Sequence, residues 1–189
     1  MNVGVIFMSA FLLSGALAPD DIVLLKYRKY LTRQVRFYWG IDQKVSIFAA
    51  QIRQESNWNP KARSRYAAGL TQFTPATARW ISTAYSELQT RGHKIDSRFD
   101  WKWSIRAMIV YDAHLYKRIT ASDPARRWTL TLRAYNGGLG WIQKEIKRCG
   151  ALDMECCLLF RSSAACAENL RYPAMIIDRW RPLYEGWDA

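Results

Sequence analysis

The chain reads Phe48-Ala-Ala-Gln-Ile-Arg-Gln-Glu-Ser-Asn-Trp-Asn-Pro60 and then, after three residues, Ser64-Arg-Tyr-Ala-Ala-Gly-Leu-Thr-Gln72. The first segment places one carboxyl group, that of Glu55, at the edge of the apolar face of a short helix. The 31 residues that follow Glu55, 56–86, contain no other acid. A carboxyl group in an apolar setting resists ionisation, so Glu55 can remain a proton donor near neutral pH. The sequence therefore indicates an acid that works without a nearby partner.

The helix itself follows from its hydrophobic pattern. Four apolar residues recur at helical spacing: Val45, Phe48, Ala49 and Ile52. We expect Asp42 to cap the start of this helix, and Glu55 falls beside Phe48 at the margin of the apolar arc. On helical geometry alone, the more ordinary expectation is that Glu55 reaches water or pairs with Arg53 or Lys61.

Further short motifs follow in a fixed order. They are Glu55-Ser56, Asn59-Pro60, Ser64, Gly69-Leu-Thr-Gln72, Pro75-Ala-Thr-Ala78, Ala134-Tyr-Asn-Gly-Gly138, and Glu168 with Tyr172. Each is weak alone, but the ordered set resembles the catalytic domain of the soluble lytic transglycosylases, lysozyme-like enzymes that cleave the glycan strands of peptidoglycan. The resemblance runs from about residue 42 to 184. It implies a mainly α, lysozyme-like helical fold around a glycan-binding groove.

The resemblance also implies a mechanism with one catalytic residue, Glu55. Glu55 would protonate O4 of the leaving N-acetylglucosamine and then take a proton from the 6-hydroxyl of N-acetylmuramic acid. That hydroxyl would close on C1 to give a 1,6-anhydro sugar, without water. Most glycosidases use two carboxyl groups, so the 2-acetamido oxygen of the substrate would replace the second one here.

The same resemblance implies a set of substrate-binding residues: Ser56, Ser64, Gly69, Gln72, Tyr135, Asn136 and Tyr172. We expect Ser56 and Ser64 to hydrogen-bond Glu55 or orient the acetamido group, and Gln72 to contact sugar. Gly69 would let the backbone approach the glycan closely. Tyr135-Asn136 should face Glu55 across the groove, and Tyr172 should approach it from the C-terminal helix.

Three positions depart from the family pattern. Thr71 stands where Met is usual and would line the groove with a smaller, more polar side chain. Gly137 stands where Ala is usual, and Glu168-Asn169 stands where Glu-Thr is expected ahead of Tyr172. A cysteine-bearing insert at about 149–166 is not a recognised feature of the family.

The remaining segments indicate helices, and no segment gives a persuasive strand. We expect a basic amphipathic helix over 22–38 and another helix over 77–88. Asp100 should cap a helix over 101–119, and Asp123-Pro124 should start one that runs to Tyr135 and is stopped by Gly137-Gly138. The last two helices are expected over 141–148 and 173–184, the latter opened by Pro173. Residues 20–189 are therefore predicted to form a single catalytic domain.

The N-terminal residues 2–19 carry no charge. Their length and the small-x-small sequence Ala16-Leu-Ala18 predict that 1–19 is a signal peptide or signal-anchor. No Lys or Arg precedes the apolar run, and a buried N-terminal helix is the alternative. We expect export to the periplasm or cell envelope, with transient membrane anchoring through residues 3–18. A phage-encoded enzyme, acting in the host periplasm or carried in the virion, is one such setting.

Four cysteines lie within 18 residues: Cys149, Cys156, Cys157 and Cys166. Their even number suits an oxidising compartment. A direct bond between the adjacent Cys156 and Cys157 is strained, so Cys149 would pair with one of them and Cys166 with the other. Four reduced thiols in a cytosolic protein are the alternative.

Composition limits the classes of partner. The net charge is +12, but no nucleic-acid motif accompanies it, so we expect a cationic enzyme held near the polyanionic envelope and no nucleic-acid partner. The two histidines, His93 and His114, form no ligand pattern, so no metal or cofactor is expected. We expect a monomer.

Three other functions compete with this reading. A goose-type lysozyme-like muramidase would need an acid to activate water, and Glu87, Asp96 and Asp100 are the candidates. A non-catalytic glycan-binding or assembly component would not depend on Glu55. Membrane disruption by the basic helix over 22–38 would not depend on it either. Among biological roles, cell lysis or local wall opening is favoured over an accessory role in secretion.

Overall fold

The computed structural model describes residues 19–89, 96–150 and 153–189, so all but the last residue of the predicted signal segment 1–19, and also His93, lie outside it. Within these ranges the chain is helical and forms no strand, only two isolated bridges, which confirms the mainly α fold. The helices are α1 (Pro19–Trp39), α2 (Ser46–Ser56), α3 (Pro75–Ala84), α4 (Trp101–Arg118), α5 (Pro124–Gly137), α6 (Leu139–Cys149), α7 (Met154–Leu158) and α8 (Ser163–Ala174). The shorter segments are η1 (Ser86–Leu88), η2 (Ser97–Phe99), η3 (Met175–Trp180) and η4 (Arg181–Trp187).

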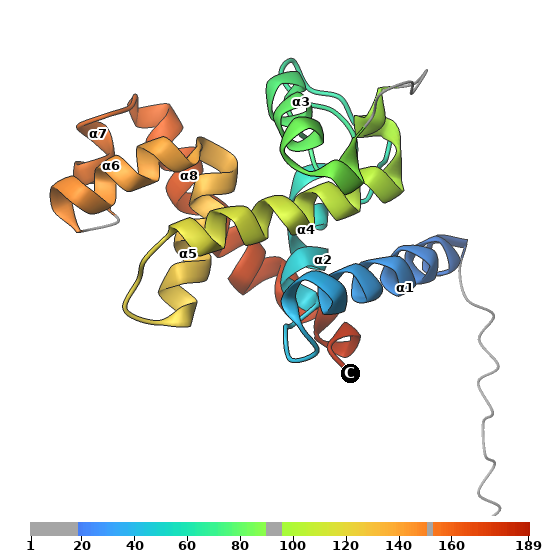
Figure 1. Ribbon diagram of the computed structural model, residues 1–189. Helices are drawn as coiled ribbons and strands as arrows, with labels where there is room; N and C mark the ends of the chain where they lie inside the picture. Colours follow the sequence, from blue (N-terminus) through green and yellow to red (C-terminus); the bar gives the residue numbers. More distant parts are fainter. Residues whose placement is uncertain (1–18, 90–95, 151–152) are drawn as a thin grey trace, which may run out of the picture.

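Helix α2 is the centre of the molecule (Figure 1). Every residue from 46 to 52 is buried, and the helix packs against α1, η3 and η4. The core around it is rich in aromatic rings, as the nine Trp of the sequence suggest. Trp58, for example, stacks on Tyr27 and contacts Tyr184 and Trp187. The helix that carries Glu55 is therefore held on several sides.

The cap of α2 differs from the prediction. Asp42 is exposed and does not cap the helix, which begins at Ser46. Instead Asp188, almost at the C-terminus, accepts hydrogen bonds from the Ser46 backbone nitrogen and the Ser46 hydroxyl, both at 2.8 Å. The carboxylate also faces the positive end of the helix dipole. A residue 142 positions away thus performs the role expected of a local one.

Two capped helix starts agree with the sequence, but two other expected boundaries are wrong. The helix expected over 77–88 is α3, which ends at Ala84 and is followed by the separate turn η1. Asp100 and Asp123 cap α4 and α5 with their side chains as predicted. Pro173, however, lies inside α8 instead of starting a helix. The chain continues past it into the π-helical segment η3, because tertiary packing carries the helix through a residue that lacks an N–H donor.

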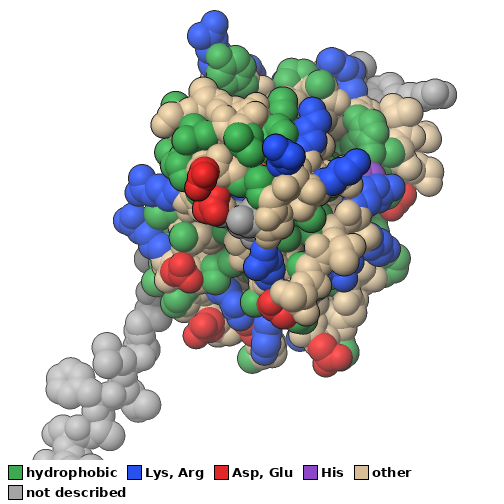
Figure 2. Space-filling model, turned by 90° about the vertical axis from the view of Figure 1, so that its left-hand side faces the viewer, with side chains coloured by type: hydrophobic (Ala, Val, Ile, Leu, Met, Phe, Trp, Pro, Cys, Tyr) green, Lys and Arg blue, Asp and Glu red, His purple; other side chains and the backbone are tan. Residues whose placement is uncertain are grey.

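Helices α3 and the α6–α7 pair project from the same side of α4 and stand apart from each other (Figure 1). Two disulfides staple the second group, Cys149–Cys156 and Cys157–Cys166, which is one of the two pairings that the sequence left open. On the face of Figure 2, Lys and Arg side chains are scattered among neutral and hydrophobic ones. Within the described ranges, no helix has the length and apolar character needed to cross a membrane.

Candidate active site

A pocket of about 560 Å³ opens where the C-terminal end of α2 meets the end of α5 and one side of α8. Its lining residues are Gln54, Glu55, Asn136, Ala167, Glu168, Arg171, Tyr172 and Met175. Glu55 thus reaches a pocket rather than the open surface. The alternative expectation, an ion pair with Arg53 or Lys61, is wrong, because no salt bridge of the described chain involves Glu55.

The environment of Glu55 favours its protonated form. Its side chain is half-buried, and the Tyr172 hydroxyl donates a hydrogen bond to Glu55 Oε1. Burial raises the pKa of Glu55 to about 8; the Tyr172 hydrogen bond opposes this rise, and the charge of Glu168 adds to it. An acid with such a pKa can donate a proton and later accept one near neutral pH.

The backbone turns sharply just after Glu55. Asn57 and Trp58 both have left-handed φ angles, 52° and 63°. Such a conformation is strained for a side chain as large as Trp58. The indole nitrogen of Trp58 donates to the Tyr184 hydroxyl at 2.7 Å inside the aromatic core, which holds the turn. The end of α2, and with it Glu55, is fixed in place.

Two tyrosines flank the acid. Tyr172 comes from α8, as expected, although not from a helix that starts at Pro173. Tyr135 lies near the end of α5, and its hydroxyl donates to the Thr71 backbone oxygen at 2.7 Å. Burial raises the pKa of both tyrosines well above the ordinary value, so both remain neutral hydrogen-bond donors. Thr71 itself is fully buried and does not line the groove, contrary to the prediction.

The hydroxyl groups of the two serines bond to the backbone rather than to Glu55. The Ser56 hydroxyl donates to the Ile52 backbone oxygen, one turn earlier in α2. The Ser64 hydroxyl accepts from the backbone nitrogens of Tyr66 and Ala67 and so shapes an exposed turn. Neither forms the expected hydrogen bond to Glu55 within the described chain. Their contacts with substrate stay a prediction.

Gly69 and Gln72 build the loop that follows. A Cβ on Gly69 would lie 1.7 Å from the Arg98 backbone oxygen, so the close approach that requires glycine is to Arg98 rather than to the glycan. The Gln72 side-chain nitrogen donates to the backbone oxygens of Gly69 and Ala62, at 2.8 and 3.3 Å. Gln72 therefore caps its own turn, and its contact with sugar stays a prediction.

Asn136 and Glu168 face each other in the pocket, where Asn136 Nδ2 donates to Glu168 Oε1 at 3.2 Å. The three acids considered for water activation lie elsewhere. Glu87 accepts from Tyr38, Asp96 pairs with Arg98, and Asp100 caps α4. Glu168 is therefore the second acid of the pocket, a role that the sequence did not suggest because 113 residues separate it from Glu55.

A further acid, Asp112, lies beneath the site and was missed by the sequence analysis. It is fully buried on α4, and Gln51 Nε2 donates to its Oδ1 at 3.4 Å. Burial raises the pKa of Asp112 well above its ordinary value, and the charge of Glu55 adds to that rise. Its Oδ2 and Gln51 Oε1 are buried and accept no hydrogen bond from the described residues. A proton on Asp112 would supply the donor that this pair of acceptors lacks.

No group of three or more His, Cys, Asp or Glu side chains within the described ranges is suited to hold a metal ion. His114 instead packs against Trp80 and hydrogen-bonds the Tyr85 hydroxyl at 2.9 Å. The polar side chains that line the pocket are those of Gln54, Glu55, Asn136, Glu168, Arg171 and Tyr172.

A family model described as "Transglycosylase SLT domain" matches residues 40–155. The chain belongs to this family. Among curated proteins, "Membrane-bound lytic murein transglycosylase F" of Shewanella denitrificans is 31% identical over 110 residues, 57% of this chain and 20% of that protein. The protein of the same name from Shewanella frigidimarina is 32% identical over 127 residues, 65% of this chain and 23% of that protein. The one from Alteromonas mediterranea is 37% identical over 106 residues, 54% of this chain and 20% of that protein. The chain therefore spans about a fifth of the length of these relatives.

Proposed function

We propose that this protein is a peptidoglycan lytic transglycosylase that cleaves the bond between N-acetylmuramic acid and N-acetylglucosamine, with Glu55 as its catalytic residue. The observation that carries the proposal is a single acid with a raised pKa, held by Tyr172 at the wall of a pocket. The family and the printed names of the relatives support the class of reaction.

Protonated Glu55 donates its proton to O4 of the leaving sugar as the bond to C1 breaks. The 2-acetamido oxygen of the muramic residue shares the positive charge that develops at C1. Glu55, now a carboxylate that accepts from Tyr172, then removes the proton of the 6-hydroxyl, which attacks C1. The product is a 1,6-anhydro sugar, and the carboxyl group returns to its protonated state. One acid with a pKa near 8 suits both steps.

Glu168 gives a second candidate, a muramidase in which this carboxylate activates water. It shares the pocket with Glu55. Against it, the Asn136 amide already occupies one of its oxygens. The lytic reaction is favoured because it needs no base besides Glu55.

Purified glycan strands distinguish the two. The wild-type protein should release 1,6-anhydro-muramic ends, and Glu55→Gln should lose activity by at least about a hundredfold, the contribution of a general acid. Glu168→Gln should retain the anhydro products. Reducing muramic ends from the wild-type protein would identify a hydrolase instead, and activity retained in Glu55→Gln would point to a non-catalytic role for this site.

We further propose that the enzyme works in the cell envelope as a monomer. The uncharged N-terminal segment and the two disulfides support export to an oxidising compartment. Fractionation of cells that express the chain tests this, because a protein retained in the cytosol with four free thiols would contradict it.

A further inference from the structure

Two of the departures from the family pattern, Gly137 and Asn169, meet the cysteine-bearing insert at one place behind the pocket. Asn169 is buried on α8, and Arg161 belongs to the cysteine-bearing insert. A methyl group on Gly137 would lie 2.4 Å from Arg161 Nη1 and 2.6 Å from Asn169 Nδ2. Both distances are too short for a real side chain. The absence of a side chain at Gly137 therefore makes room for these two residues against α5.

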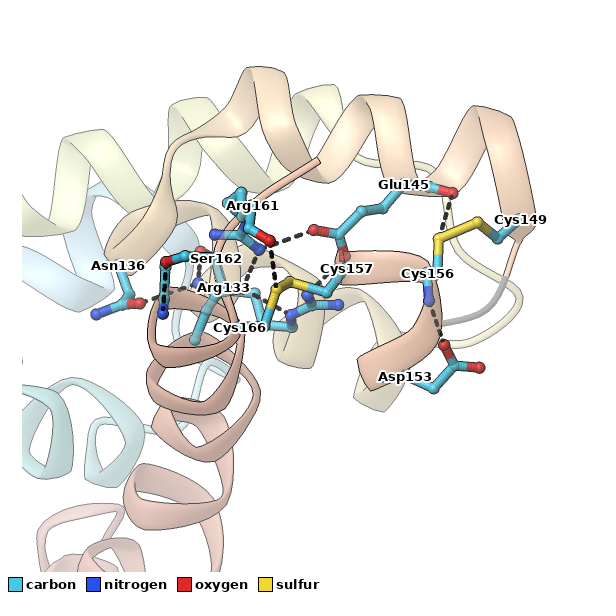
Figure 3. Close-up of a disulfide and its surroundings, with 12 residues drawn as sticks. Arg133, Asn136, Glu145, Cys149, Asp153, Cys156, Cys157, Arg161, Ser162 and Cys166 are labelled. Atoms are coloured by element: carbon cyan, nitrogen blue, oxygen red, sulfur yellow. Dashed lines mark hydrogen bonds and ion pairs between the residues drawn. A yellow bond between two sulfur atoms is a disulfide. The ribbon is translucent and has the colours of Figure 1, made fainter. Parts of the chain in front are cut away.

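A buried charge cluster fixes one end of the Asn169 amide. Glu145 is fully buried and accepts from Arg133 at 2.6 Å and from Arg161 at 2.7 Å (Figure 3). The same two arginines also donate to Asn169 Oδ1, each at 2.9 Å. Buried cations need such acceptors, since an arginine donor without a partner is costly. The oxygen of Asn169 is thereby held on the arginine side. A flipped amide would place the Asn169 N–H donors against the N–H donors of the two arginines.

The other end of the amide points to the pocket. Asn169 Nδ2 donates to the Arg133 backbone oxygen at 2.8 Å and to Asn136 Oδ1 at 2.9 Å. Because the Asn136 oxygen is occupied, its nitrogen takes the opposite direction and donates to Glu168. The pocket therefore faces an N–H donor of Asn136, whose direction is set from behind by Asn169 and from within the pocket by Glu168.

We propose that Asn169 is a positioning residue that orients the Asn136 amide for an acceptor group of the glycan, such as an acetamido oxygen. The insert supports Asn169 through Arg161, which lies in the loop closed by Cys157–Cys166. This inference rests on the proposed function of the pocket. It assigns to the stapled insert a part in substrate binding, through contacts that are all internal to the protein.

Asn169→Asp tests this role, with KM and Tm measured on the same variant. The new carboxylate keeps both arginine hydrogen bonds and offsets the net positive charge of the Arg133, Arg161 and Glu145 cluster, but it loses the hydrogen bond to the Arg133 backbone oxygen and repels that oxygen, so the Tm should fall. The carboxylate cannot donate a hydrogen bond to Asn136. The Asn136 amide must therefore flip, so that its nitrogen faces the new carboxylate and the pocket loses the N–H donor. We expect the KM for soluble glycan strands to rise about tenfold with little change in kcat, the usual effect of one hydrogen bond. Ser163→Asp adds the same charge to an exposed position on α8 and should change neither value.

A double-mutant cycle with Asn136→Ala tests the route. In that background Asn169→Asp should leave KM as it is, because the residue that it orients is gone. Partial unfolding does not imitate this result, since it lowers the active fraction and leaves KM alone. An unchanged KM in Asn169→Asp, or the same rise with and without Asn136, would overturn the inference while the wild-type protein still forms anhydro products. Absence of those products would instead refute the proposed function.

Discussion

The acidity of Glu55 is the sum of opposing contributions. Burial and the nearby Glu168 carboxylate disfavour its ionised form, whereas the Tyr172 hydroxyl donates to it and favours that form. Burial dominates, so the pKa rises to about 8. Each contribution comes from a different element, and each can be removed separately.

The first prediction concerns pH and activity. In the proposed mechanism the first step needs protonated Glu55, so kcat/KM should fall as the pH rises through about 8. Tyr172→Phe removes the hydrogen bond that favours the carboxylate, so this fall should move to higher pH. The initial rate of release of anhydro products, measured from pH 5 to 10, tests both expectations. A fall of kcat/KM that begins at lower pH in Tyr172→Phe than in the wild-type protein would contradict the second expectation.

The second prediction concerns stability. Between about pH 4.5 and 8 folded Glu55 keeps a proton that the unfolded chain has lost, so the folded state loses stability as pH rises through this window. Glu55→Gln removes this dependence. It should stabilise the fold by about 1–3 kcal/mol at pH 8 and change little at about pH 4.

Urea unfolding of both proteins at the two pH values measures this difference. The exposed Glu185→Gln is the control for loss of one carboxylate. A stabilisation by Glu55→Gln that is equal at both pH values would show that the buried charge is not its cause.

At this scale the sequence predicts Glu55 and the tyrosines but not Asp112. Glu55 stands out because its local pattern is amphipathic and lacks other acids. Asp112 lies on a helix whose pattern gives no reason to single it out, and its partner Gln51 is 61 residues away. The contacts of Gly69 with Arg98 and of Gln72 with its own turn could not be predicted, because a short motif does not specify loop geometry. The contact of Gln72 with sugar stays a prediction.

At the level of the helices, the packing of α5 against α8 shapes the back of the pocket. The third prediction tests the close contact of Gly137 with Arg161 and Asn169. Gly137→Ala places a methyl group within 2.6 Å of both Arg161 and Asn169, so it should destabilise the fold by about 1–3 kcal/mol and lower activity. Thermal unfolding and glycan cleavage give the two readouts.

Gly140→Ala is the matched control. It lies three residues later in α6, where a new Cβ would meet nothing within 4 Å. Relief of glycine's backbone entropy should make it neutral or stabilising, by up to about 1 kcal/mol. Equal effects of the two substitutions would remove the steric argument for Gly137.

Helix boundaries divide into those that short-range chemistry determines and those that it does not. Asp100 and Asp123 accept hydrogen bonds from backbone N–H groups that follow within three residues, so their caps could be predicted. Pro173 is a start signal in isolation. In the folded chain α8 is already ten residues long when it reaches Pro173, and its packing outweighs the missing hydrogen bond.

Across the whole molecule, distant segments of the chain converge on α2. Asp188 caps its first residue, and Trp180 donates to Gln54 beside Glu55 at 2.8 Å. The fold class follows from the motifs and the helical patterns. These closing contacts do not, since a cap that comes from 142 residues away has no local signature.

The fourth prediction compares two aspartates. Asp188→Ala removes two hydrogen bonds from the start of α2 and should cost about 1–2 kcal/mol of stability. Asp42→Ala, the cap expected from the sequence, should change stability by less than about 0.5 kcal/mol. Chemical unfolding of both variants decides between them, and a larger loss from Asp42→Ala would show that the local cap operates in solution.

The origin of the oxygen at the cut end tests the central claim most directly. Glycan strands digested in water enriched in heavy oxygen should give anhydro-muramic ends with no heavy oxygen, because in the proposed mechanism the 6-hydroxyl of the sugar itself attacks C1. Incorporation of one heavy oxygen at C1 of each product would show that water is the nucleophile. That result would contradict a mechanism in which Glu55 works alone.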